Sequence, residues 1–128
     1  MNDYWTYAYI RHGAYPEHTP RGGKWLIFVS VRNLDHVWSK IKRAVEEGKL
    51  GGIAKTVQSG GNSGRSKSAA TVICVYTYDW MDVQDVKRIR AELRKIGITR
   101  KLSYKTDEDT ERGIYRATTS EKVSKYYE

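Results

Sequence analysis

The chain has 128 residues, of which 39% are hydrophobic and 30% charged, a balance typical of one folded domain that excludes a disordered or collagen-like chain. Lys and Arg number 23 and Asp and Glu 15, so the net charge of +8 indicates a polyanionic partner. The single cysteine, Cys74, excludes an internal disulfide and a Cys-rich zinc site, and no apolar run approaches the roughly 20 residues that span a bilayer.

These features predict the setting and organisation of the chain. We expect a single domain over residues 1–128 in the reducing cytoplasm, with no membrane segment, no export signal, no bound metal and no cofactor. A Gly- and Ser-rich stretch predicts a flexible loop over residues 58–69, and a polar tail is expected over about 116–128.

The apolar pattern predicts strands and two helices in chain order. Alternating aromatic residues predict a strand at 4–10, and a run of apolar residues predicts a second strand, buried on both faces, at 24–31. Apolar residues spaced by three and four predict a helix from an Asn33 cap to Gly48, and another from an Asp82 cap to Gly97. Further strands are expected at 53–57, 70–78 and 102–105.

The order of these elements predicts an α+β fold, with one antiparallel or mixed sheet and two helices on one face. The other face is then free to present Trp and Tyr rings for stacking on flat ligands, including nucleobases. The candidate stacking residues are Trp5, Tyr7 and Trp25. Such rings can equally fill a core with their polar atoms at its rim, and composition leaves both readings open.

Basic side chains form two candidate phosphate-binding groups. Lys87, Arg90 and Arg94 follow one ridge of the second helix, which indicates either a phosphate-binding stripe or a solvated helix face. Arg65 and Lys67 lie in the Gly- and Ser-rich loop, which is either a plain connector or a loop that closes over RNA or phosphate. This loop is not a nucleotide P-loop, because it lacks the spacing and joins two strands.

Two lysines and the three histidines are further candidate functional residues. Lys55 is a lone cation among apolar residues of its strand, so it either extends to water or serves as a general base. Lys105 lies beside a run of hydroxyls and carboxylates, which indicates a phosphate-binding cation or a capped turn. The three histidines show no metal-ligand spacing and are expected at the surface.

Four ordered motifs carry a family resemblance: GKWLIF at 23–28, DHVWSKI at 35–41, VYTYDW at 75–80 and YKTDEDT at 104–110. Together they resemble the family typified by the basophilic-leukaemia-expressed protein. That family is similar in fold to the cap-binding translation initiation factors, whose curved, mostly antiparallel sheet is backed by helices. In those factors tryptophans sandwich a methylated guanine and basic residues bind its phosphates, so the resemblance implies the same kind of face here.

The chain also resembles the phosphothreonine lyases of bacterial effectors, whose lysine removes a proton while a histidine protonates the leaving phosphate. This resemblance implies Lys55 as the base and Arg65, Lys67 and Lys105 as the phosphate clamp. Leu26 stands where those enzymes place the histidine. A phosphate-binding descendant without the activity is the implied outcome.

The sequence therefore predicts a non-catalytic protein that binds RNA or nucleotide phosphates through a basic helix and an aromatic sheet face. RNA or a ribonucleoprotein is the expected partner. The alternatives are a phosphothreonine-lyase-like enzyme acting on a phosphorylated protein or peptide, and a protein-interaction module whose charge serves only solubility.

Overall fold

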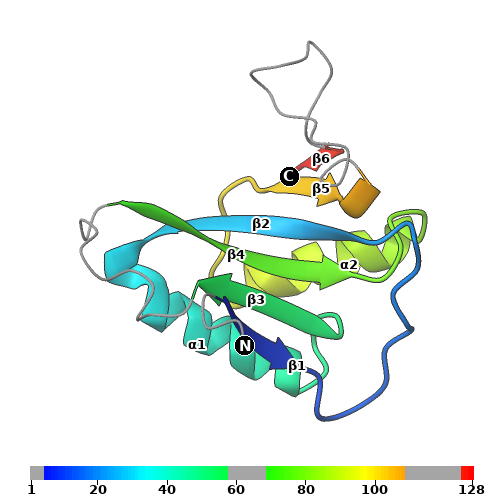
Figure 1. The fold of residues 1–128 in the computed structure, drawn as a ribbon, viewed down its shortest axis with the longest axis horizontal. Helices are drawn as coiled ribbons and strands as arrows, with labels where there is room; N and C mark the ends of the chain where they lie inside the picture. The colour runs from blue at the N-terminus through cyan, green and yellow to red at the C-terminus, as the bar shows by residue number, and fades with distance from the viewer. Residues whose placement is uncertain (1–4, 58–68, 109–124) are drawn as a thin grey trace.

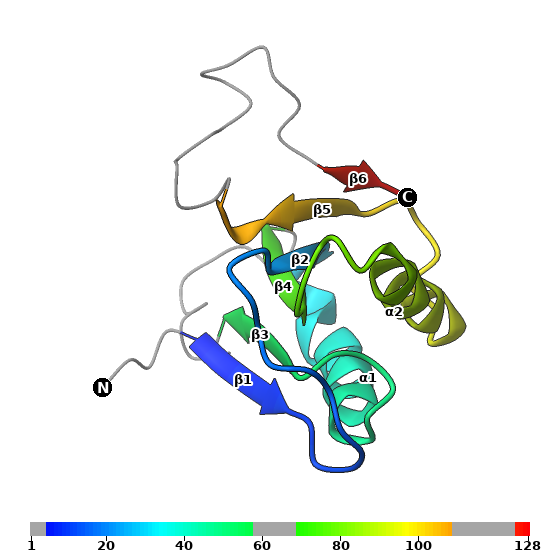
Figure 2. The same cartoon turned by 90° about the vertical axis from the view of Figure 1, so that its right-hand side faces the viewer.

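The computed structural model describes residues 5–57, 69–108 and 125–128. In this part of the chain one antiparallel sheet has the strand order β1-β3-β4-β2-β5-β6, and two helices lie against one of its faces (Figures 1 and 2). The predicted α+β class is confirmed. The strands are β1 (Trp5–Tyr9), β2 (Gly23–Ser30), β3 (Ile53–Val57), β4 (Ala70–Thr77), β5 (Ser103–Thr106) and β6 (Tyr126–Tyr127), and the helices are α1 (Leu34–Glu46) and α2 (Val83–Lys95).

Both helices end where the sequence predicts. Gly48 and Gly97 follow α1 and α2 with φ of +80° and +105°, the left-handed conformation that glycine adopts without strain. Asp82 caps α2 by accepting a hydrogen bond from the main-chain N–H of Asp85 at 3.1 Å. Asn33 makes no such side-chain bond, because a 3₁₀ turn at Val31–Asn33 leads the chain into α1. Neither helix in the described ranges has the length and apolar character needed to cross a bilayer.

Side chains of β2 alternate between the core and the other face of the sheet. Trp25 and Ile27 are fully buried, and the indole N–H of Trp25 donates to the carbonyl oxygen of Val86 in α2 at 3.1 Å. Phe28 is 56% exposed. The expectation that this strand is buried on both faces is therefore wrong, since the helices cover only one of them.

The core lies between the sheet and the two helices. Ile41 and Val45 of α1 and Ile89 and Leu93 of α2 are all fully buried there. These are the positions that the spacing of three and four selects, so each helix turns its apolar stripe toward the sheet. The opposite face of the sheet carries no helix in the part of the chain that the structure describes.

The segment between β1 and β2 is tied to the start of α2. The hydroxyl of Tyr15 donates to the carboxylate of Asp85 at 2.5 Å, and the N–H of Thr19 donates to the carbonyl oxygen of Tyr78 at 2.9 Å. The N–H of Trp80 donates to the carbonyl oxygen of Arg21 at 2.7 Å. These bonds hold residues 15–21 beside one end of the sheet.

Tyr126 and Tyr127 form a short strand, β6, that the sequence does not predict. The N–H of Lys125 donates to the carbonyl oxygen of Tyr104 at 2.7 Å, and Leu102 and Glu128 exchange main-chain bonds at 2.7 and 3.0 Å. Tyr126 packs edge-on against Tyr104, with ring centroids 5.4 Å apart. The expected polar tail is thus corrected for residues 125–128. Residues 116–124, and residues 58–68 of the predicted loop, lie outside the described residues.

Two buried threonines offer a matched stability test. The Thr71 hydroxyl has no hydrogen-bond partner in the part of the chain described, whereas that of Thr56 donates to the carbonyl oxygen of Val72 at 2.9 Å. Thr71→Val should raise the free energy of unfolding by about 1 kcal/mol, and Thr56→Val should lower it by about 1 kcal/mol. Urea denaturation of both variants measures this difference. Equal destabilisation would show that the Thr71 hydroxyl is satisfied in solution.

Four tyrosines hold their protons more tightly in the fold than in the unfolded chain. Burial raises the pKa of Tyr15, Tyr76 and Tyr104 above the ordinary value of about 10. The hydrogen bond that the Tyr78 hydroxyl donates to Asp82 raises the pKa of Tyr78 to about 12. All four side chains therefore stay neutral in the folded protein at a pH where they ionise once it unfolds.

Alkaline pH should consequently destabilise the protein. The contribution of these tyrosines is complete below about pH 10 and is lost as pH rises through their folded pKa values, because the unfolded state then binds fewer protons. Burial lowers the pKa of Arg90 to about 10, so this residue has the opposite effect on stability above pH 10. It is a single group, and the four tyrosines together outweigh it. The tyrosinate absorbance of these four residues should rise in the same cooperative step above pH 10 in which the circular dichroism signal is lost. Ionisation of all four near pH 10 with the fold intact would contradict this.

Candidate functional site

The face of the sheet opposite the helices, here called the open face, carries a continuous cross-strand row of side chains. Strand register places these residues side by side, and alternation directs them away from the Trp25 side of the sheet. From β1 to β6 the row contains Tyr7, Lys55, Cys74, Leu26, Ser103 and Tyr127. Aromatic rings thus lie at both ends of the row.

Lys55 lies against aromatic rings on the open face. Its ammonium nitrogen is 4.1 Å from the ring centroid of Trp5 and 6.0 Å from that of Tyr76. Among the residues that the structure describes, no carboxylate forms an ion pair with it. The faces of these rings stabilise the ammonium.

Tyr76 is the centre of a second group of basic side chains. The ammonium nitrogen of Lys24 lies 5.7 Å from its ring centroid, and the imidazole of His18 packs edge-on at 6.2 Å between centroids. The Lys24 ammonium also donates to Oδ1 of Asp107 at 3.0 Å. Lys105 is the register partner of Lys24 on β5, so the predicted candidates Lys55 and Lys105 share the open face with Lys24.

His18 is a functional candidate that sequence reasoning missed. It is exposed, as predicted, but its Nε2 lies 2.6 Å from Oδ2 of Asp107. Its ring also occupies the space that a side chain at Gly22 would fill. Eighty-nine positions separate His18 from Asp107, so no local pattern reveals the pair. The adjacent glycines Gly22 and Gly23 were the one signal of close packing nearby.

The three predicted stacking residues do not share one environment. Trp5 and Tyr7 belong to the open face, where Tyr7 is 40% exposed and stacks on Tyr9 with ring centroids 6.0 Å apart. Trp25 is fully buried between the sheet and α2, so its prediction as a stacking residue is wrong. Its indole N–H bonds to a helix carbonyl instead of facing a ligand.

Comparison with known protein families shows to which family the chain belongs. Residues 16–111 match the model of the family described as "Basophilic leukemia-expressed protein Bles03". The chain belongs to the Bles03 family. The family expected from the four sequence motifs is therefore confirmed.

This Bles03-family chain is also similar to solved structures of schistosome eIF4E. One, complexed with m7GpppA and 4E-BP, gives a TM-score of 0.62 at 15% identity over 84% of this chain and 59% of that chain. Another, complexed with m7GpppG and 4E-BP, gives 0.61 at 17% identity with the same coverage. The chain thus spans 59% of the length of these relatives. The likeness confirms the expected fold.

The basic ridge of α2 lies on the other side of the sheet and is largely engaged within the fold. Arg90 is 3% exposed and donates to the carbonyl oxygens of Glu128, Ile98 and Arg100 at 2.8, 3.0 and 2.6 Å. Its prediction as a phosphate contact is wrong, because a buried guanidinium with these partners cannot reach a ligand. Burial lowers the pKa of Arg90 to about 10.

The other members of that ridge differ in exposure. Lys87 forms an ion pair with the side chain of Glu128 and lies over the ring of Tyr126, with its nitrogen 4.5 Å from the centroid. Arg94 is exposed and donates to the carbonyl oxygen of Thr99 at 2.7 Å. The predicted surface combining the basic helix with the aromatic sheet face does not form, since α2 and the open face are on opposite sides. Arg65 and Lys67 lie outside the described residues.

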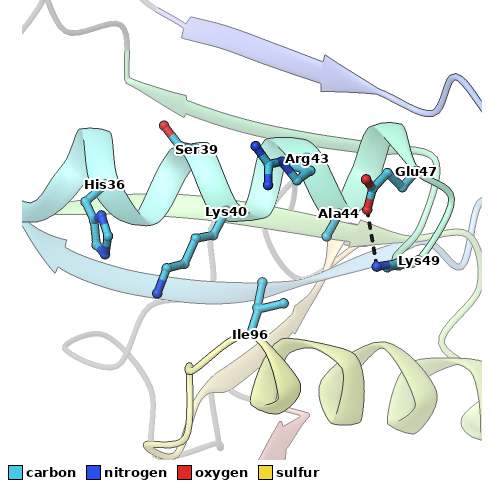
Figure 3. Close-up of a pocket in the computed structure, with 8 residues that line it drawn as sticks. All are labelled: His36, Ser39, Lys40, Arg43, Ala44, Glu47, Lys49 and Ile96. Atoms are coloured by element: carbon cyan, nitrogen blue, oxygen red, sulfur yellow. Dashed lines mark ion pairs between the residues drawn. The ribbon is translucent and has the colours of Figure 1, made fainter.

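A groove of about 460 Å³ lies between α1 and the residue that follows α2 (Figure 3). Lys49 and Glu47 form an ion pair at its rim, at 3.2 Å. In the described ranges no group of three or more His, Cys, Asp or Glu could hold a metal ion, here or on the open face. The groove is lined by His36, Ser39, Lys40, Arg43, Ala44, Glu47, Lys49 and Ile96.

Arg90 and Arg94 allow a test of which basic residues serve the fold. Arg90→Met should lower the free energy of unfolding by about 3 kcal/mol, because three carbonyl oxygens lose a charged donor. Arg94→Met removes the same charge from an exposed site and should cost less than about 1 kcal/mol. Urea denaturation measures both. Similar stabilities for the two variants would show that the Arg90 bonds contribute little.

Proposed function

We propose that this chain binds a nucleotide, or RNA through a nucleotide, on the open face of its sheet. The observation that carries the proposal is the Lys55 ammonium, held 4.1 Å from the Trp5 ring centroid with no carboxylate paired to it in the described ranges. A nucleotide has a base, which stacks on an aromatic ring, and a phosphate, which binds a cation, so it needs both groups side by side.

The two parts of such a ligand have separate contacts on the open face. A base can stack on the exposed ring of Tyr7 or on Trp5, a contact worth about 1–3 kcal/mol per base. Its phosphates can then meet Lys55 and, further across the sheet, Lys24 and Lys105, which are register partners. These lysines lie on three different strands, which favours a ligand with more than one phosphate.

The comparisons support the same class of ligand. The two schistosome eIF4E structures of this fold are complexed with m7GpppA and m7GpppG, each a nucleotide with phosphates. RNA or a ribonucleoprotein is the macromolecular partner that would present such a group. The proposed role is binding without catalysis, because Leu26 stands where the resemblance to phosphothreonine lyases implies the proton-donating histidine.

Titration of the full chain with m7GpppG and with GTP, followed by tryptophan fluorescence and calorimetry, tests the proposal. Lys55→Ala should weaken binding about tenfold through loss of a charge-assisted contact. Lys95→Ala is the matched control, because it removes the same charge from α2 on the other side of the sheet. Its affinity should stay within about twofold of the unmodified protein.

Three results would contradict the proposal. Equal losses in the two variants would indicate unspecific attraction by net charge. Absence of nucleotide binding together with binding of a phosphothreonine peptide would favour the phosphopeptide alternative. A phosphothreonine peptide that loses the mass of one phosphoric acid during incubation would establish the elimination reaction instead.

A further inference from the structure

Asp107 occupies the corner of the open face just after β5, where two basic side chains converge on its carboxylate. One oxygen, Oδ1, accepts from the Lys24 ammonium at 3.0 Å, and the other, Oδ2, lies 2.6 Å from Nε2 of His18. The main-chain N–H of Asp107 donates to the carbonyl oxygen of Gly22 at 2.9 Å, which fixes the residue there. The carboxylate is therefore held as a two-oxygen anion between two donors.

His18 and Lys24 are each positioned by contacts other than those to Asp107. The His18 ring packs over Gly22 and edge-on against Tyr76, and the Thr19 hydroxyl donates to the carbonyl oxygen of Tyr78, the residue that follows β4. Lys24 lies within β2 and only 10% of its side chain is exposed. The two basic groups, here called the cradle, thus have contacts of their own with the Tyr76 ring besides those to the carboxylate.

We infer that His18 and Lys24 form the phosphate subsite of the open face and that Asp107 is an internal competitor occupying it. This inference rests on the proposed function. Two oxygens of a phosphate group present the same acceptor pattern as the carboxylate, with more negative charge. Binding of that phosphate requires the Asp107 side chain to turn away, which lowers the apparent affinity by the fraction of molecules in which the cradle is vacant.

The subsite lies within reach of the ligand already proposed. The ammonium nitrogens of Lys24 and Lys55 lie 5.7 and 6.0 Å from the same Tyr76 ring centroid. A terminal phosphate held by His18 and Lys24 therefore leaves the inner phosphates toward Lys55 and the base toward Trp5. The ligand class narrows to a nucleotide with a chain of phosphates, and a nucleoside monophosphate spans only part of the face.

The decisive experiment removes the competitor and retains the cradle. Asp107→Asn keeps the shape of the side chain and an oxygen that accepts from Lys24, but it removes the charge. Calorimetric titration of the full chain with GTP should show binding about tenfold tighter in this variant. Glu108→Gln is the matched control, because it removes the same charge one residue later and should change affinity less than about twofold. Equal affinities in the two variants, or weaker binding in Asp107→Asn, would overturn the inference.

A second measurement on the unmodified protein decides the matter if Asp107→Asn does not fold. Inorganic phosphate should shift the imidazole NMR signals of His18, while those of His36, in the groove beside α1, stay in place. His18→Gln assigns the signal. Equal shifts of both histidines, or none at His18, would show that no phosphate subsite exists here.

The results separate this inference from the proposed function. Nucleotide binding that depends on Lys55 but is unaffected by Asp107→Asn leaves the function standing and rejects the subsite. Phosphate binding that tightens in Asp107→Asn, without any effect of Lys55→Ala, keeps the anion subsite and rejects the nucleotide. A phosphothreonine peptide that binds Asp107→Asn more tightly than GTP does would contradict the ligand class.

Discussion

The hydrogen bond from the indole of Trp25 to the carbonyl oxygen of Val86 joins β2 to α2 and thereby orients the whole sheet. Side chains alternate along a strand, so fixing Trp25 against the helix places Lys24 and Leu26 on the open face. The antiparallel register then carries this assignment to both neighbouring strands. A slip of one residue would turn Lys24 into the core and separate its ammonium from Asp107.

The basic residues of the chain have two different roles, and these roles fall on opposite sides of the sheet. On the helix side, Arg90 and Lys87 hold the last strand in place through carbonyl oxygens and the Glu128 side chain. On the open face, Lys55 and Lys24 lie against aromatic rings. Net charge alone therefore overstates the surface offered to a polyanion, and the position of each cation relative to the sheet decides its role.

Local pattern was enough to predict most of the fold, because period and capping are local properties. Both helices, the strand at 53–57 and the glycine stops follow from residue spacing. The strand β6 was missed because two tyrosines in a polar segment give no period. Trp25 was misplaced because an apolar run does not show which face the helices cover. The role of Arg90 and the pairing of His18 with Asp107 depend on residues far apart in sequence, which spacing cannot reveal.

Cys74 lies in the middle of the cross-strand row, between Lys55 and Leu26, and is the single cysteine of the chain. Burial raises the pKa of its thiol, while the nearby Lys55 and Lys24 lower it. Any reagent that alkylates this sulfur has to arrive through the open face, since the core closes the other side. The rate at which this one sulfur is labelled therefore measures how readily a reagent reaches the middle of the open face, with no probe added to the protein.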